Sequence, residues 1–130
     1  MRYRFLRFPG GLLKAVTLSY DDGCKDDIRF SETICAHGLK CTFNINSGFI
    51  AEKEGDWHLT HEQIKKYLID TGNEIAVHGK YHRASGKQLP IDGIRDVLEC
   101  RTELENDFGM IIRGMAYPDS GITRFENGAE

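Results

Sequence analysis

The sequence predicts an α/β fold built on parallel strands, and three observations support this prediction. Short apolar runs alternate with amphipathic segments along the chain, which is the order expected of repeated strand–helix units. Each apolar run ends in polar residues or glycine, as expected where a buried strand leaves a sheet. Strands that are separated by a helix pair in parallel through right-handed crossovers. We therefore expect about four such units in a single domain that spans residues 1–130.

The composition is that of an ordinary globular domain and argues against several classes of partner. The 130 residues are 40% hydrophobic and 28% charged, with a formal net charge of −3. A charge this small does not favour binding to nucleic acid or to an anionic membrane. No apolar run approaches the roughly 18 residues that a membrane span needs. The basic and aromatic N-terminus lacks the apolar core of a signal peptide, so we expect a cytoplasmic protein unless an export segment has been removed.

The first predicted strand ends in a candidate site. Residues 1–14 are expected to form an edge strand or a lead-in, and the apolar, β-branched residues 15–20 predict a short buried strand. Asp21, Asp22 and Gly23 follow as a turn. Such a turn is usually a solvated loop. In parallel α/β sheets, however, ligands bind outside the carboxyl ends of the strands, which makes this turn the first place to look for chemistry.

Two further units follow this turn. Acidic residues open a helix at Asp26 through the helix dipole, and Gly38 is placed to cap it. The alternating residues 41–46 predict a second strand. Thr60-His61-Glu62-Gln63 matches a capping box, so we expect a second helix that starts there and ends before Gly72.

The remaining strands flank a strongly periodic helix. Residues 74–77 predict a third strand, and apolar residues at helical spacing predict a helix over residues 91–108 that Gly109 closes. Residues 110–117 predict a fourth strand, and residues 122–130 carry no periodic signal.

A histidine pair after the third strand suggests a metal site. His78 and His82 are four residues apart and would share one face of a helical turn, close enough to hold one ion. Alone, such a pair is most often a surface feature. If the first and third strands are neighbours, an aspartate from the first turn completes a two-nitrogen, one-oxygen set with open positions. The set suits Zn²⁺, although Fe²⁺, Co²⁺ and Ni²⁺ also occupy such sites. The second aspartate would remain free as a base, with backbone N–H groups near a developing oxyanion.

The motifs resemble those of the polysaccharide deacetylase family, the NodB-homology domain of carbohydrate esterase family 4. Residues 17–23 resemble the first motif of the family, residues 78–82 are similar to the second, and residues 116–121 resemble the third. The resemblance implies a distorted (β/α) barrel, of which this chain would hold an N-terminal part. It also implies removal of acetyl groups from sugars with the help of a divalent metal.

The resemblance further implies a role for individual residues. Asp21 would be the catalytic general base. The metal ligands would be Asp22, His78 and His82. One wall of the substrate groove would be formed by Tyr117, Pro118 and Asp119.

The chain departs from the family pattern in three ways. Gly79 stands where the family has a hydroxyl residue in the second motif. The arginine of the third motif, which would support Asp21, is not matched, since Ala116 takes its position and Arg113 lies nearby. The later motifs, with the histidine general acid, have no counterpart before Glu130, and a complete barrel takes about 250 residues. A partial barrel would leave the fourth strand with an open edge, through which two copies could pair as a homodimer.

The expected function is that of a metal-dependent hydrolase that removes acetyl groups from an N- or O-acetylated carbohydrate. Two alternatives remain open at this point. The chain could be a non-catalytic metal- or carbohydrate-binding fragment, or a hydrolase of the same fold that acts on a non-sugar amide. The polar loop around Trp57 slightly favours a sugar.

Overall fold

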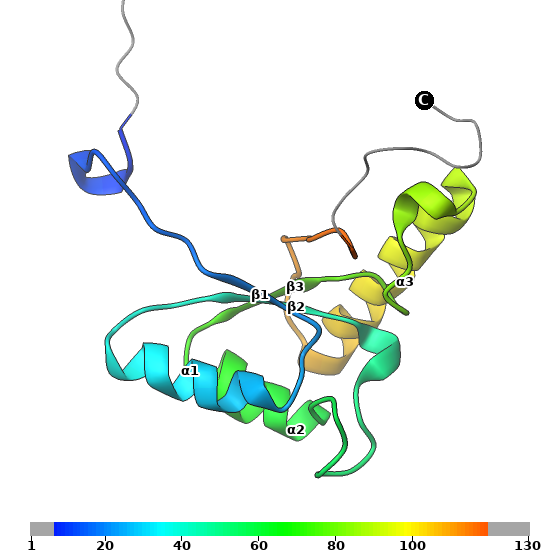
Figure 1. Ribbon diagram of the computed structural model, residues 1–130, viewed down its shortest axis with the longest axis horizontal. Helices are drawn as coiled ribbons and strands as arrows, with labels where there is room; N and C mark the ends of the chain where they lie inside the picture. The colour runs from blue at the N-terminus through cyan, green and yellow to red at the C-terminus, as the bar shows by residue number, and fades with distance from the viewer. Residues whose placement is uncertain (1–6, 120–130) are drawn as a thin grey trace, which may run out of the picture.

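Three parallel strands form the sheet, in the order β1 (Ser19–Asp21), β2 (Thr42–Ile45) and β3 (Glu74–Val77) (Figure 1). The computed structural model describes residues 7–119. All strand pairs are parallel, so their carboxyl ends lie at one edge of the sheet. The prediction of a parallel α/β fold is therefore confirmed. The strand β2 occupies the central position. The first and third strands are therefore not neighbours, contrary to the arrangement from which the site was predicted.

The first strand is shorter and more exposed than predicted. The hydrogen bond nearest the N-terminal end of β1 that joins this strand to β2 runs from the Thr42 N–H to the Leu18 carbonyl, at 3.0 Å. Of the described residues, 7–17 have no strand beside them, because the β2 ladder begins at Thr42. Val16 is consequently 88% exposed, and residues 7–17 form an arm that runs out from the sheet (blue in Figure 1). The expectation of a buried strand over residues 15–20 was wrong. The arm contains a short turn, η1 (Pro9–Gly11), rather than an edge strand.

Helix α1 (Asp26–Ala36) begins and ends as the sequence predicts. Asp26 and Asp27 lie in its first turn, where the helix dipole favours negative charge. At the other end Gly38 has φ +70°, and its N–H donates to the Cys35 carbonyl at 2.9 Å. The Leu39 N–H donates to the Ile34 carbonyl at 3.0 Å, which completes a Schellman motif.

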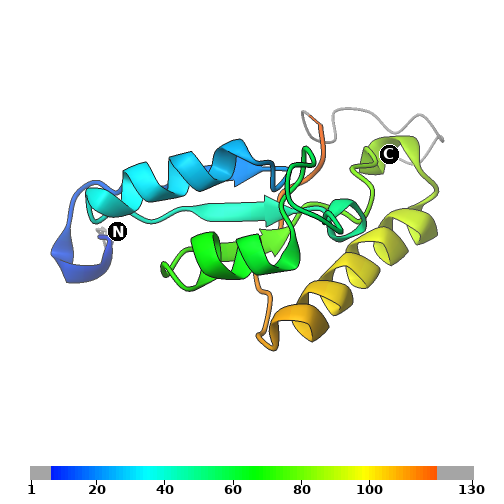
Figure 2. The same ribbon diagram turned by 90° about the horizontal axis from the view of Figure 1, so that it is seen from below.

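The second predicted helix is present, but it changes from α-helical to π-helical hydrogen bonding along its length. Thr60 and Gln63 form both hydrogen bonds of the expected capping box at the start of α2 (His61–Gln63). The helix continues as the π-type segment η3 (Ile64–Ile69), in which the Asp70 N–H donates to the Lys65 carbonyl at 2.8 Å. Figures 1 and 2 show that α1 and the α2–η3 helix cover the same face of the sheet. The core lies beneath them and contains the buried side chains of Phe43, Ile45, Ile64, Leu68 and Ile75.

Helix α3 (Pro90–Phe108) closes at Gly109, as predicted, but only part of its apolar stripe is buried. Cys100 and Leu104 are fully buried in the core, whereas Ile94 and Leu98 are each 56% exposed. The helix contacts β3 and the short turn η2 (Ser47–Phe49). No helix in the described residues is long and apolar enough to cross a membrane.

The prediction of a fourth strand over residues 110–117 was wrong. A single bridge between Met115 and Val77 joins this segment to β3. The Ile112 N–H donates to the Glu105 carboxylate on α3 at 3.0 Å, so the start of the segment bonds to the helix instead of to a strand. The homodimer that was expected to form through an open edge of this segment stays a prediction.

Candidate metal centre

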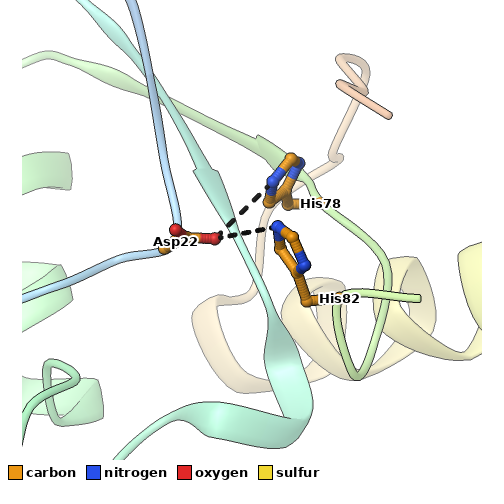
Figure 3. A group of neighbouring side chains, drawn as sticks. All are labelled: Asp22, His78 and His82. Atoms are coloured by element: carbon orange, nitrogen blue, oxygen red, sulfur yellow. Dashed lines mark ion pairs between the residues drawn. The ribbon is translucent and has the colours of Figure 1, made fainter. Parts of the chain in front are cut away.

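Three side chains from two strand exits converge at the carboxyl edge of the sheet (Figure 3). Asp22 follows β1, while His78 follows β3 directly and His82 lies in the loop beyond it. The Asp22 Oδ1 atom lies 3.6 Å from His78 Nε2 and 3.5 Å from His82 Nε2. One ligand atom from each of the three residues lies within 4.8 Å of the other two. The structure thus brings together the three residues that the sequence analysis had named as ligands, across the exit of β2.

The geometry of these three side chains fits a small divalent cation. Zinc–ligand bonds of about 2.0–2.1 Å in a tetrahedral site place ligand atoms about 3.3 Å apart, close to the two observed distances. The Nδ1 atom of His78 lies 3.1 Å from the Ala116 carbonyl, which can only accept a hydrogen bond. Nδ1 is therefore placed to donate a proton to that carbonyl, which leaves Nε2 as the ring nitrogen that faces Asp22. His78 is only 2% exposed, whereas the Asp22 side chain is 47% exposed, so the group is rigid on one side and open to solvent on the other.

The histidine pair lies in a loop, so the prediction that it shares a helical turn was wrong. Gly79 has φ +71° and His82 has φ +51°, two left-handed conformations that a right-handed helix excludes. Two buried or half-buried side chains hold this loop. The Nδ2 atom of Asn46 donates to the carbonyls of His78 and Gly79 at 2.5 and 3.0 Å. The Asp96 Oδ2 atom accepts from the Lys80 N–H at 3.0 Å.

These contacts explain the departure at Gly79. A Cβ atom at this position would lie 2.6 Å from Asp96 Oδ2 and 3.3 Å from Pro118 Cγ. The positive φ and the close carboxylate both favour glycine. The bond from Lys80 to Asp96 steadies the loop that a hydroxyl side chain was expected to steady.

Asp21, the predicted base, directly precedes Asp22 in the chain and is hydrogen-bonded to a side chain of the central strand. Its Oδ1 atom accepts a hydrogen bond from Asn44 Nδ2 at 2.7 Å. Within the described residues no hydrogen bond or ion pair joins Asp21 to Arg113, which is exposed. Neither Asn44 nor Asn46 was among the residues predicted for the site. Their signal was available, since two asparagines at alternate positions of an apolar strand lie on one face of it.

The third motif contributes support behind the histidines. Ala116 orients the His78 ring, and Pro118 is buried against the Gly79 loop. Tyr117 is 50% exposed and Asp119 is exposed, so both have side chains that solvent reaches. The substrate-binding role of these residues stays a prediction. Ser120 and Gly121, the end of the motif, lie outside the described residues.

Burial perturbs one carboxyl group near the site. Asp27, in the first turn of α1, is 0% exposed, and its Oδ2 atom has no hydrogen-bond partner. Burial raises the pKa of Asp27 to about 7, although the hydrogen bond from the Cys24 thiol acts to lower it. The same burial raises the pKa of that thiol.

A parallel α/β sheet that carries one carboxylate and two imidazoles at the carboxyl ends of its strands defines an α/β protein with a candidate metal centre. The model of the family described as polysaccharide deacetylase matches residues 3–125. The chain belongs to the polysaccharide deacetylase family, as the sequence motifs suggested. Among curated proteins, none matches the chain significantly.

Solved structures share the fold. The deacetylase PplD of Streptococcus pyogenes, solved in complex with acetate, superposes with a TM-score of 0.76 at 21% identity, over 84% of this chain and 48% of that chain. IcaB from Ammonifex degensii gives a TM-score of 0.70 at 24% identity, over 87% of this chain and 52% of that one. BA3943 of Bacillus anthracis, described as a carbohydrate esterase family 4 pseudoenzyme, gives 0.62 at 20% identity, over 81% and 35%.

At these identities the likeness concerns the fold, which is of the NodB (β/α) barrel type. The chain spans about half the length of PplD and of IcaB.

Proposed function

We propose that the protein is a metal-dependent hydrolase that removes acetyl groups from an N- or O-acetylated carbohydrate. The observation that carries the proposal is the convergence of Asp22, His78 and His82, with the carboxylate of Asp21 one residue away. Membership of the polysaccharide deacetylase family supports the same class of reaction.

The donor set names the residues that would hold the cation. One carboxylate and two neutral imidazoles suit Zn²⁺ best, and Co²⁺, Ni²⁺ and Fe²⁺ accept the same ligands. A divalent ion bound there lowers the pKa of a water molecule toward about 7 and polarises a carbonyl group. Asp22 supplies the charged ligand, and the Ala116 carbonyl keeps His78 in the tautomer that can bind.

Asp21 acts in this proposal as the general base. Its Oδ1 atom is occupied by the Asn44 amide, which leaves Oδ2 to take the proton of the attacking water. Because Asp21 is not a member of the cation cluster, its substitution separates proton transfer from metal binding. A positioned base contributes about 10²- to 10⁴-fold to such a reaction.

The test compares the wild-type protein with Asp21→Asn. Both proteins are stripped of metal and reloaded with Zn²⁺, after which acetate release from N-acetylglucosamine oligomers is measured. We expect equal zinc affinity and about 10²- to 10⁴-fold slower release by the variant. An N-acetylated non-sugar amide serves as the control substrate. Acetate release by Asp21→Asn at the wild-type rate would overturn the assignment of the base.

A non-catalytic binding module is the second candidate. It is favoured by one observation, namely that BA3943, a structure of the same fold, is described as a pseudoenzyme. In that case zinc binds to the wild-type protein, and Asp22→Ala abolishes binding, but no oligomer of any length releases acetate. Release from the control amide alone would instead indicate an amide hydrolase.

A further inference from the structure

The central strand carries an amide side chain that is directed at the predicted base. Asn44 lies in the middle of the sheet and is only 2% exposed. Its Nδ2 atom lies 2.7 Å from Asp21 Oδ1 and 2.8 Å from Ser19 Oγ, with the Tyr20 carbonyl at 3.4 Å. A carboxylate and a backbone carbonyl can only accept, so these neighbours assign the NH₂ group to this side of the amide.

A buried amide in a central strand requires its hydrogen bonds. An unpaired amide in a protein interior costs about 1–3 kcal/mol, and Asn44 is only 2% exposed. All partners that the amide group of Asn44 contacts belong to β1. Hydrogen bonds to an ionised carboxylate are roughly twice as strong as neutral ones. The Asn44 amide group therefore bridges from the central strand to β1, where its contacts with Ser19 and Tyr20 fix its position and its third contact is the Asp21 carboxylate.

Asp21 needs such an anchor, because its own surroundings constrain it little. The residue is exposed and ends a strand of three residues at the edge of the described sheet. Within residues 7–119, Arg113, the arginine nearest in sequence to the third motif, forms no hydrogen bond or ion pair with it. A bond from a rigid, buried donor to Oδ1 selects one orientation of the carboxylate and leaves Oδ2 for proton transfer.

We propose that Asn44 is a positioning residue that holds the Asp21 carboxylate in its reactive orientation. The inference rests on the proposed function, in which Asp21 is the base. Under this inference, two asparagines of the β2 segment support different parts of the site. Asn44 holds the base after β1, while Asn46, on the same face of the strand, holds the histidine loop after β3. Substitution of Asn44 is thus expected to affect turnover and not metal affinity.

The experiment uses Asn44→Ala and Asn44→Asp in the zinc-loaded chain. We expect Asn44→Ala to lower kcat by about 10- to 100-fold, the usual cost of losing an outer supporting contact, with KM and zinc affinity unchanged. Asn44→Asp preserves the shape of the side chain but cannot donate and repels Asp21, so its kcat falls at least as far. In the Asp21→Asn background Asn44→Ala causes no further loss of kcat, because the two residues act as one unit.

The matched control is Asn73→Ala. Asn73 is also buried, at 6% exposed, and accepts from the Cys41 N–H and donates to Ser31 Oγ at the opposite ends of the strands. Its loss lowers the melting temperature but leaves the kcat of the folded protein unchanged. If Asn44→Ala behaves like Asn73→Ala, with a lower melting temperature and normal kcat, the role is structural and the inference is overturned.

A second measurement does not depend on folding of the Asn44 variants. The side-chain amide resonance of Asn44 is compared by NMR between the wild-type protein and Asp21→Ala, and we expect it to shift when the acceptor is lost. An unchanged resonance overturns the inference even if the protein is an active deacetylase. If the wild-type protein releases no acetate, the proposed function fails, and the inference falls with it.

Discussion

The Oδ1 atom of Asp22 lies 3.6 Å from the Nε2 atom of His78, although the strands that these residues follow do not pair with each other. Neighbouring strands are about 4.8 Å apart, so β1 and β3 are separated by roughly twice that distance. The gap is closed because all three strands are parallel and end at one edge. Asp22, with φ +79°, and the buried His78 then meet over the exit of β2.

This relationship predicts that zinc affinity depends on Asp22, His78 and His82. Each alanine substitution removes one ligand, so we expect a loss that exceeds the about 10- to 100-fold cost of an outer contact. Isothermal titration with Zn²⁺ measures the affinity. His61→Ala is the control, since this exposed histidine pairs with Asp107 away from the cluster, and its zinc affinity stays at the wild-type value. Undiminished zinc binding by Asp22→Ala would contradict the ligand assignment.

Gly79→Ala is expected to destabilise the protein and to weaken zinc binding. The substitution places a Cβ atom 2.6 Å from Asp96 Oδ2 in addition to the strain of a positive φ. Strain alone costs about 1–2 kcal/mol for a non-glycine residue. Gly109→Ala measures the cost of the backbone strain alone, because Gly109 has φ +63° and nothing lies within 4 Å of the added Cβ atom. Urea denaturation should show a larger loss for Gly79→Ala than for Gly109→Ala. Equal losses would mean that the contact with Asp96 is unimportant.

The buried carboxyl of Asp27 predicts a pH-dependent stability. Its pKa is raised from 3.8 to about 7 by burial, so the folded state binds this proton more tightly than the unfolded state. The resulting stabilisation is fully present below pH 3.8 and is lost as the pH rises through about 7. Each pKa unit corresponds to about 1.36 kcal/mol, which sets an upper limit of about 4 kcal/mol.

Asp27→Asn should remove this dependence, because an amide stays neutral throughout the range. The free energy of unfolding, measured by urea denaturation at several pH values, should fall less steeply with rising pH in the variant than in the wild-type protein. Asp26→Asn, at the exposed neighbouring position, keeps the wild-type slope. Parallel profiles for Asp27→Asn and the wild-type protein would contradict the prediction.

Thr60→Ala is expected to cost about 0.5–2 kcal/mol of stability, the usual effect of losing an N-cap. The side chain accepts the Gln63 N–H at 3.2 Å and is half of a reciprocal pair at the start of α2. Urea denaturation measures the loss. Thr33→Ala is the control, since that hydroxyl bonds back to the Arg29 carbonyl inside α1 and caps nothing. A larger loss for Thr33→Ala would contradict the importance of the cap.

Local signals predicted the helices because their causes are local. The acidic start of α1, the glycine at its end and the capping box at Thr60 each act within a few residues, and each is found where it was expected. The strands at residues 15–20 and 110–117 failed for the opposite reason. A strand needs a partner, and neither Val16 nor Ile111 has one in the described structure.

The site shows the same division. The types of residue after the first and third strands, together with the family motifs, were enough to name Asp22, His78 and His82. The conformation of the histidine loop was not predictable, because it depends on Asn46 and Asp96, which are distant from it in sequence. Asn44 was missed for the same reason, since its importance lies in a contact with a residue 23 positions away.

The amino-acid sequence was enough to predict the α/β class, the positions of the helix ends, the family and the side chains that could bind a cation. The strand order, the length of β1, the path of residues 110–117 and the side chains that hold Asp21 and the histidines in place became visible only in the folded chain. This difference arises because caps and dipoles act over one helical turn. Strand pairing and buried hydrogen bonds instead join residues that only the folded chain brings together.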